Sequence, residues 1–331
     1  MLTKKENLLE TINGGSPDRY VKRFEAMCWL AMGDPVASMY ETFEKGTTWK
    51  NAWGVTITWP EWLTSSIPLH GPGLNVVDDI LNWRDTFHNP DVHNLPESSW
   101  AIWDGIAATC DHGEQFLTVS TYPGLMDQLH MLMGMEEAFV AVLDEPEEVS
   151  ALVNCYADFL IDYVSVICDR YHPDALFEHD DWGSKISTLT SPQTFDEIFL
   201  EPYKRMHAAY RELGIHLIIH HSDSYAATLA PEMIAMDVDV WQGVLTSNDV
   251  PRLVREYGPE LTIMGGIDSD EVDVEGATRE LIAQRVEEIC RACGTKYFVP
   301  CTTMGGSDSL YPGVSDMVDE EIDRMSAIMF A

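Results

Sequence analysis

The residues with the clearest capacity for chemistry are His221 and Asp223, which follow directly on an apolar stretch. The stretch LII at 217–219 has the composition of a buried strand, and His220 and His221 end it. Side chains alternate between the two faces of a strand, so His220 and His221 point in opposite directions while the chain stays extended. His221 and Asp223 can bind one cation if the backbone turns out of the strand between them. The alternative is that these polar side chains only form hydrogen bonds at the strand end.

Cys301 occupies a comparable position after the apolar stretch YFV at 297–299 and offers a thiolate. Histidine, carboxylate and thiolate are all zinc ligands, and a site with three protein ligands keeps its fourth position open, as catalytic zinc sites do. We therefore predict a zinc site formed by His221, Asp223 and Cys301. Asp223 serves in it either as the third ligand or as a group that orients a ligand through a hydrogen bond.

Four further residues near predicted strand ends are candidates for catalysis. Asp180 and Asp181 follow the strand-like stretch at 175–177 and could act as a general acid and base. Equally, one of the two could cap a helix that begins near residue 182. Glu178 and Gln242 are the other candidates, because either could complete the coordination of the metal.

Gly265, Gly266 and Asp268 come at the end of the apolar stretch at 261–264, and we assign them to cofactor binding. Glycine inside a strand pattern indicates that a ligand or another part of the backbone approaches closely. A plain tight turn would explain the same two glycines.

The elements that must position these residues alternate between strands and helices. From about residue 115 the pattern predicts a series of segments along the chain. The strands are expected at 115–120, 175–177, 215–219, 238–241, 261–264 and 297–299, and the helices after residue 146 and at 193–213, 250–257 and 277–293. This alternation is typical of β-α units and a parallel sheet.

A barrel explains the strand-end residues better than an open sheet does. A doubly wound open sheet would also place ligands at its strand ends, but no G-x-G-x-x-G stretch follows the first predicted strand. We therefore predict an α/β fold, a (β/α)8 TIM barrel, whose carboxyl-end face carries the site.

The first third of the chain departs from this alternation. It contains eight of the ten tryptophans and reads as short helices and loops. We predict one domain over residues 1–331, with 1–114 as an N-terminal helical or irregular extension and 115–331 as the main barrel. Some of these tryptophans could line an apolar ligand pocket, although packing of the extension onto the barrel would also use them.

The charge balance excludes two classes of partner. The chain has 20 basic and 55 acidic residues, a formal net charge of −35. Nucleic acids and anionic membrane surfaces bind clustered Lys and Arg, so neither is expected as a partner.

The same sequence predicts a cytoplasmic protein. No apolar run approaches the ~18 residues that suggest a membrane span, and the opening MLTKKENLLETI does not have the pattern of a signal peptide. The seven cysteines are odd in number and unevenly spaced, which favours reduced thiols. A homo-oligomer is compatible with these features.

In the order of its motifs the chain resembles the uroporphyrinogen decarboxylase superfamily, and within it the branch of corrinoid-dependent methyltransferases. The matching stretches cover nearly the whole chain and read KKENLLETINGGSPDRYV, LDEPEEVSALV, FEHDDWGSKISTLTSPQTF, GIHLIIHHSDS, MDVDVWQGV, MGGID and YFVPCTTMGG. The resemblance implies a (β/α)8 barrel whose N-terminal extension covers the barrel mouth. The decarboxylases grip their substrate with several arginines near the N-terminus. The comparable stretch here has one, Arg23, so porphyrinogen decarboxylation is not expected.

The methyltransferase branch implies zinc bound through an H-x-C motif and a later cysteine. His221-Ser222-Asp223 falls on the H-x-C position with aspartate in place of cysteine, and Cys301 falls near the second cysteine. A carboxylate donates less charge than a thiolate, which leaves zinc a stronger Lewis acid and favours an ether or alcohol oxygen. We therefore expect methyl transfer from a small methoxylated, aromatic substrate to a corrinoid (cobalamin). A partner protein would carry the corrinoid, because this chain has no D-x-H-x-x-G corrinoid signature.

Asp180, Asp181 or water is expected to give a proton to the departing oxygen. Three other functions stay open. One is the reverse half-reaction, from a methylated corrinoid to a thiol. The others are a decarboxylase-like reaction without metal and a metal-free barrel that serves as a binding subunit.

Overall fold

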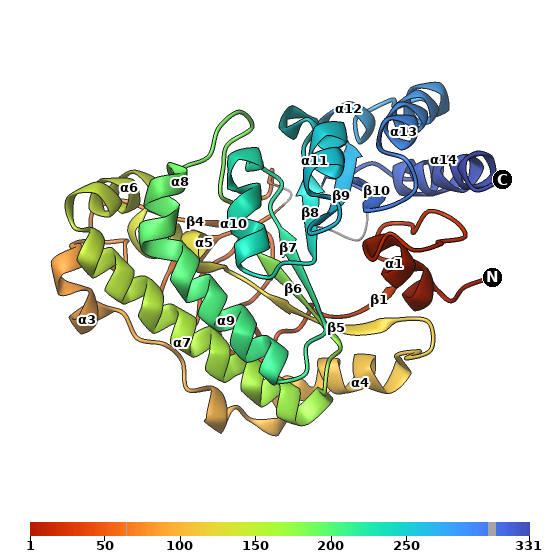
Figure 1. Ribbon diagram of the computed structural model, residues 1–331. Coiled ribbons are helices and arrows are strands. Elements are labelled where there is room, and N and C mark those ends of the chain that lie inside the picture. Colours follow the sequence, from red (N-terminus) through yellow and green to blue (C-terminus); the bar gives the residue numbers. More distant parts are fainter. Residues whose placement is uncertain (64, 304–308) are drawn as a thin grey trace.

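A curved parallel sheet forms the centre of the computed structural model (Figure 1), which describes residues 1–63, 65–303 and 309–331. The end of the YFVPCTTMGG stretch, Met304 to Gly306, lies outside these residues. The described part of the sheet has seven strands in the order β1-β5-β6-β7-β8-β9-β10. Their bounds are β1 Met27–Leu30, β5 Phe116–Thr121, β6 Ala175–His179, β7 Leu217–His221, β8 Val240–Val244, β9 Thr262–Ile267 and β10 Phe298–Thr302. A smaller antiparallel sheet joins β2 Thr48–Lys50, β3 Thr56–Thr58 and β4 Ile67–Pro68.

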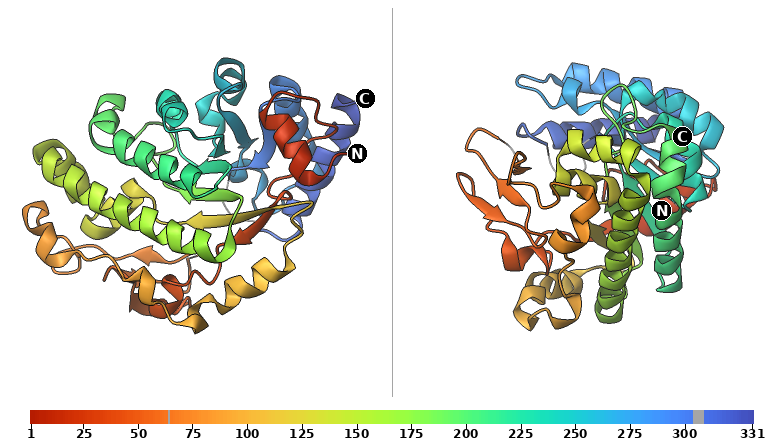
Figure 2. Two further views of the ribbon diagram at one scale, coloured as in Figure 1. Left: turned by 60° about the horizontal axis from the view of Figure 1, so that its bottom comes forward. Right: turned by 90° about the vertical axis from the view of Figure 1, so that its left-hand side faces the viewer.

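Helices follow the strands and cover the outer side of the curved sheet, as Figure 2 shows. The α-helices of the described residues are α1 Lys4–Ile12, α2 Ala37–Tyr40, α3 Trp83–Thr86, α4 Ala101–Thr109, α5 Leu125–Met133, α6 Met135–Asp144, α7 Pro146–Tyr171, α8 Pro192–Phe195, α9 Glu201–Glu212, α10 Ala230–Ala235, α11 Val250–Tyr257, α12 Ser269–Val272, α13 Arg279–Cys293 and α14 Val314–Met329. The two chain ends lie close together beside α14 (Figures 1 and 2). The predicted α/β class with a parallel sheet is therefore confirmed.

Two apolar clusters divide the core. The larger one fills the layer between the sheet and the helices. The smaller one lies on the inner face of the sheet and includes Phe24, Phe177, Ile219, Met264 and Cys301. Successive side chains of each strand alternate between these two clusters.

The edges of the sheet, β1 and β10, are not hydrogen-bonded to each other within the described residues. α1, the segment at 20–25 and α14 lie across this opening (Figure 1). The backbone N–H of Tyr297 donates to Thr11 O (2.9 Å), and the Tyr20 hydroxyl donates to Gly294 O (2.9 Å). The part of the chain described here thus forms a curved seven-stranded sheet. Closure into an eight-stranded barrel stays a prediction.

β1 comes from the stretch at 1–114 that the sequence pattern assigns to an extension. It pairs in parallel with β5, with Met27 opposite Phe116, and so belongs to the main sheet. A strand of four residues is too short for its alternation to stand out in the sequence.

The strands end later than their apolar patterns do. β6 includes His179, β7 includes His220 and His221, and β10 includes Cys301. Polar residues interrupt the apolar pattern, but the backbone pairing between neighbouring strands continues past them. These side chains therefore have fixed directions set by strand alternation.

α7 is long and apolar enough to cross a membrane by length and composition alone, and 56% of the relevant window is buried in the protein. Its buried residues include Val149, Leu152, Tyr156, Leu160 and Val164, which belong to the larger apolar cluster. The central helix of a globular core has the same composition. One such helix is therefore weak support for a membrane span.

Substituting Gly265 by Ala should lower the free energy of unfolding by about 2–3 kcal/mol, because the new Cβ would overlap a neighbouring strand. That Cβ would lie 2.6 Å from Val244 N and 2.7 Å from Val244 O, both backbone atoms of β8. The measurement is urea unfolding followed by circular dichroism. Gly105→Ala in α4 is the matched control. Nothing lies within 4 Å of its added Cβ, so it should stabilise the helix by about 0.5–1 kcal/mol. Equal midpoints for the two variants would contradict the strand-packing role of Gly265.

Candidate metal centre

Two H-x-D sequences end adjacent strands of the sheet. His179-Asp180-Asp181 ends β6, and His221-Ser222-Asp223 ends β7. The two strands pair in a register that sets His179 opposite His221. The imidazole ring centroids of these two residues are 4.5 Å apart. Only the second of these motifs carries the zinc prediction made from the sequence.

Five side chains gather at this end of the sheet. His179, Asp181 and Asp127 form one group of ligand atoms within 4.8 Å of one another, and Asp181, His221 and Asp223 form a second. Asp127 comes from the first turn of α5, which follows β5. Asp181 belongs to both groups and therefore links the His179 group to the His221 group. The structure thus brings the predicted residues Asp181, His221 and Asp223 together.

The charges in this cluster are unbalanced in favour of negative groups. Burial and the charge of Asp223 raise the pKa of Asp181 to about 7. Burial also raises the pKa of Asp223, and the charge of Asp127 adds to that rise. Burial alone would lower the pKa of His179, but its hydrogen bond to Asp127 (Nδ1 to Oδ2, 3.3 Å) and the nearby carboxylates raise it to about 9. A bound cation would relieve the repulsion among these carboxylates.

His221 is prepared to offer a lone pair. Burial and the neighbouring His179 lower the pKa of His221 well below its usual value, so the ring is neutral. Nδ1 of His221 hydrogen-bonds to Oε1 of Gln242, which can only accept. Nδ1 therefore carries the proton, and Nε2 is left with the lone pair that a metal needs. Gln242 orients this ring from β8.

Gly243 lets β8 approach the ring of His221 closely. Its φ is +88°, and a Cβ at this position would lie 2.9 Å from both Cε1 and Nδ1 of His221. Thr303 O would lie 3.1 Å from the same Cβ. A side chain at position 243 would therefore push the His221 ring out of place.

Asp180 is a structural residue in this structure. It is fully buried, and its carboxylate accepts hydrogen bonds from the N–H groups of Met126 (3.0 Å) and Asp127 (2.6 Å) at the start of α5. The indole of Trp182 (2.9 Å) and the hydroxyl of Tyr203 donate to the same carboxylate. Burial and the charge of Asp127 raise its pKa, and the hydrogen bonds from Tyr203, Met126 and Asp127 oppose the rise. Asp180 is a cap, as the sequence allowed, but of α5 and not of a helix at 182.

Glu178 lies on the opposite side of the sheet from the cluster. Its Oε2 contacts Nε2 of His207 on α9 (3.1 Å) and Nδ1 of His220 (3.1 Å), and all three side chains are fully buried. Burial alone would raise the pKa of Glu178, but the two histidines lower it to about 2. The assignment of Glu178 to catalysis is therefore corrected to a buried charged network behind the site. His220 faces away from His221, as strand alternation predicts.

Gly265, Gly266 and Asp268 have packing and capping roles. A Cβ on Gly265 would strike the backbone of Val244, and a Cβ on Gly266 would lie 2.8 Å from Ile289 of α13. Asp268 caps α12 through the N–H of Asp270 (2.9 Å). The close approach indicated by the glycine pair is thus to the protein itself, and we do not assign these residues to a cofactor.

Cys301 stays outside both groups of ligand atoms. It is fully buried in the inner apolar cluster, and burial raises the pKa of its thiol to about 12. Gln242 lies between the two predicted ligands, because it hydrogen-bonds both His221 and the Cys301 thiol. All seven cysteines are free thiols, in agreement with the expectation of reduced cysteines.

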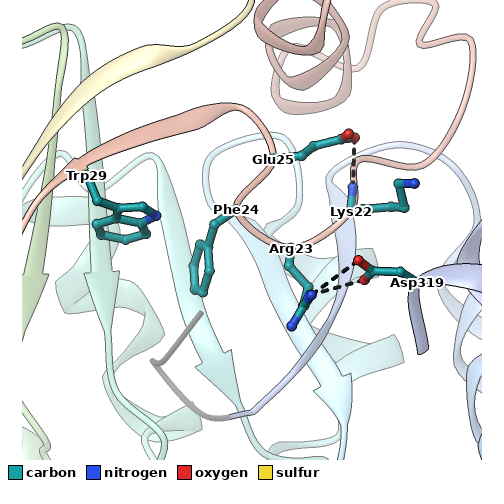
Figure 3. Close-up of a pocket in the computed structure, with 6 residues that line it drawn as sticks. All are labelled: Lys22, Arg23, Phe24, Glu25, Trp29 and Asp319. Carbon is teal, nitrogen blue, oxygen red and sulfur yellow. Dashed lines mark hydrogen bonds and ion pairs between the residues drawn. The ribbon is translucent and has the colours of Figure 1, made fainter. Parts of the chain in front are cut away.

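An aromatic wall leads from the cluster into a cavity near the edge of the sheet. The ring of His221 stacks on Phe177 (centroids 5.6 Å apart), and Phe177 meets Trp29 at 4.9 Å. Phe24 meets Trp29 at 5.0 Å. The cavity has a volume of about 360 Å³ and is lined, among the described residues, by Lys22, Arg23, Phe24, Glu25, Trp29 and Asp319. Figure 3 shows the rings of Phe24 and Trp29 on one side of the cavity. Arg23 lies on the other side and is paired with Asp319 (3.1 Å).

The tryptophans of the first third divide by role. Four are buried in the larger cluster and two more pack against it, namely Trp49, Trp83, Trp100 and Trp103, with Trp53 and Trp59. Trp62 is exposed. Trp29 is the one of the eight that packs against the inner cluster and belongs to the aromatic wall. Packing therefore accounts for most of them.

Two residues of the cluster, His179 and Asp127, were not singled out from the sequence. His179 had a signal, because His179-Asp180-Asp181 repeats the H-x-D spacing one strand earlier. Asp127 had none, since it lies in the first turn of an apolar helix. Its position depends on α5 starting against Asp180.

The donor set fits a divalent cation. Imidazole and carboxylate together suit zinc and related first-row metals. The second group supplies one neutral imidazole and two carboxylates, which is a set of three protein ligands.

Comparison with known proteins identifies the family. A sequence profile of the uroporphyrinogen decarboxylase (URO-D) family matches residues 124–300. The match covers more than half of the chain and includes the strands that carry the cluster, and the chain belongs to this family. Among solved structures, a methyltransferase from Methanosarcina mazei superposes with a TM-score of 0.68 at 11% sequence identity, covering 98% of this chain and 99% of that chain. At that identity the likeness establishes the shared fold. No curated protein sequence matches the chain.

Metal analysis of ligand variants should separate the two proposed ligand sets. After loading with zinc and desalting, the wild type should hold about one ion per chain, as a single three-ligand site would. His221→Ala and Asp181→Asn should each lose most of the metal. Cys301→Ala should keep it, because the sulfur lies outside both groups. Full retention in His221→Ala would refute the site, and loss in Cys301→Ala would support the thiolate ligand.

Proposed function

We propose that this protein is a methyltransferase that moves a methyl group from a small methoxylated aromatic compound to a corrinoid carried by a partner protein. The observation that carries the proposal is the cluster of two histidines and three aspartates at the carboxyl ends of β6 and β7 and the start of α5, with an aromatic wall beside it. The fold shared with a protein named as a methyltransferase supports it.

Asp181, His221 and Asp223 would hold a zinc ion. When bound there, zinc would act as a Lewis acid toward the ether oxygen of the substrate. Gln242 keeps the proton of His221 on Nδ1 and so directs Nε2 toward the metal. An oxygen-rich ligand set without a thiolate suits an oxygen-containing substrate better than a thiol. This favours demethylation of an ether over the reverse transfer to a thiol.

His179 and Asp127 form a dyad beside these ligands that can supply a proton. Nδ1 of His179 is hydrogen-bonded to Oδ2 of Asp127 (3.3 Å). The other ring nitrogen, Nε2, is therefore available to transfer a proton to a bound molecule. Asp180, with four donors around its carboxylate, is closed to this role. The departing phenolate or alkoxide oxygen would take its proton from His179.

The aromatic ring of the substrate would lie against Phe177 and Trp29. Ligand sites are mostly apolar with a few fixed polar groups, and this wall runs from His221 toward a cavity of about 360 Å³. Arg23 is paired with Asp319 in that cavity, so the site offers no cluster of arginines to a substrate with many carboxylates.

Apolar side chains at the mouth support docking of a partner that presents a corrinoid. Met32 after β1, Tyr122 after β5 and Ile186 after β6 are 84%, 58% and 83% exposed. All three follow strand ends on the face that carries the cluster. Exposed apolar groups gathered on one face are typical of interaction surfaces.

The direct test mixes the protein with a reduced corrinoid protein and one methyl donor at a time. Methoxyarenes, methanol, methylamines and methylated thiols form the panel, and the absorbance of the methylated corrinoid is followed. We expect its growth with a methoxyarene. Turnover with a methylated corrinoid and a thiol alone would assign the opposite half-reaction. No turnover with any corrinoid would place the protein outside this class of reaction.

Removing the proposed proton donor should slow the reaction without removing the metal. His179→Gln is expected to lower kcat by about 100-fold, within the range that a general acid contributes. The measurement pairs steady-state demethylation with metal content. His93→Gln is the matched control, since His93 and Asp162 form a similar pair (2.9 Å) on the surface. An unchanged kcat in His179→Gln would eliminate the dyad from the mechanism.

A further inference from the structure

A second, narrow cavity lies between α7 and the end of β5. Its volume is about 20 Å³. A cavity needs about 10–15 Å³ on this measure to hold one water molecule, so there is room for a single particle of that size. The lining residues are Asp34, Val36, Trp53, Thr121, Tyr122, Tyr156, Phe159, Leu160 and Tyr163.

Asp34 brings a carboxylate into this cavity without a cationic partner. Its Oδ1 accepts the N–H groups of Val36 (2.9 Å) and Ala37 (2.8 Å), and its Oδ2 accepts the hydroxyl of Tyr163 (2.7 Å). These three donors are uncharged. Within the described residues, neither Asp34 nor the nearby Glu41 forms an ion pair with Lys, Arg or His. Asp34 is partly buried, and a carboxylate with limited access to solvent is stabilised by a nearby positive charge or metal.

Thr121 gives an independent sign that the cavity binds a ligand. It is 4% exposed, and its hydroxyl has no hydrogen-bond partner among the described residues. A buried polar group without a partner is rare in folded proteins. Thr121 and Asp34 both line this cavity.

We propose that this cavity binds one monovalent cation of the size of potassium or ammonium. Asp34 supplies one compensating charge, and the hydroxyls of Thr121 and Tyr163 supply uncharged oxygens. Trp53, Tyr156 and Phe159 also line the cavity, and the face of an aromatic ring attracts cations. The volume excludes larger organic ammonium groups. A magnesium ion, which keeps several of its waters, does not fit either.

The proposed cation would also affect the neighbouring cluster. Tyr122 connects the cavity with the cluster. It lines the cavity, and its ring centroid lies 5.0 Å from that of His179. A filled cavity would therefore hold Tyr122 in position against His179. This inference stands on the cavity and does not depend on methyl transfer.

The test compares thermal unfolding in potassium, ammonium, sodium and choline chloride at equal ionic strength. In potassium or ammonium chloride the wild type should melt about 3 °C or more above its midpoint in choline chloride, because a ligand bound only to the folded state stabilises it. Thallium(I) NMR should show one bound resonance that potassium displaces.

The variant Thr121→Val tests the site directly. The wild-type hydroxyl has no hydrogen-bond partner within the described part of the protein, so the substitution breaks no bond there. In choline chloride this variant should melt at or slightly above the wild-type midpoint, and in potassium chloride below it. Asp34→Asn should also lose the potassium effect. Thr118→Val is the control on the same strand. Its hydroxyl bonds to Phe116 O (3.0 Å), and it does not line the cavity, so its midpoint should fall equally in all salts.

Equal midpoints of the wild type in all four salts would overturn the proposal and leave a water molecule as the occupant. A potassium effect that persists in Thr121→Val and Asp34→Asn would also overturn it, because the cation would then bind elsewhere. Stabilisation by sodium alone would contradict the size argument.

Discussion

The alternation of side chains along two paired strands is the constraint on which the site depends. β6 and β7 are in a register that sets Glu178 opposite His220 and His179 opposite His221. One pair therefore faces the helices and the other faces the inside of the curved sheet. A slip of one residue in either strand would turn the side chains of that strand to the other face, break both pairs and remove the cluster. The same two strands thus build a charged core network and a ligand site on opposite faces.

The network behind the sheet holds that register. Oε2 of Glu178 is shared by His207 and His220, and Nδ1 of His207 contacts Met236 O at 2.7 Å. Burial lowers the pKa of His220, so this histidine is a neutral donor to Glu178. Removing a hydrogen-bond partner of a buried charged group typically costs about 1–3 kcal/mol or more. α9, β6 and β7 are therefore tied together one residue before each histidine of the site. Trp182 packs over His220 at 4.1 Å and encloses the network further.

In front of the sheet the same strands gather negative charge. Three carboxylates approach two histidines; burial raises the pKa values of Asp181 and Asp223, and repulsion among the carboxylates adds to the rise. Such an arrangement is unfavourable without a cation, and it persists because Asp180 and the buried network fix the backbone on either side. The overall charge of −35 acts in the same direction, since it raises the local concentration of cations around the protein. Structural stability behind the sheet and cation binding in front of it are thus two results of one strand pairing.

The sequence alone determined the class of fold, because β-α spacing and apolar periodicity are local properties. It also determined the opposite directions of His220 and His221, since alternation follows from strand geometry. It could not determine which strand ends meet. His179 and Asp127 join His221 only through the pairing of β6 with β7 and the start of α5 against Asp180. Glu178 and Cys301 looked like site residues because polar or reactive groups near a strand end look alike in sequence. Which face each one occupies, and what already fills the space around it, was decided by the tertiary packing.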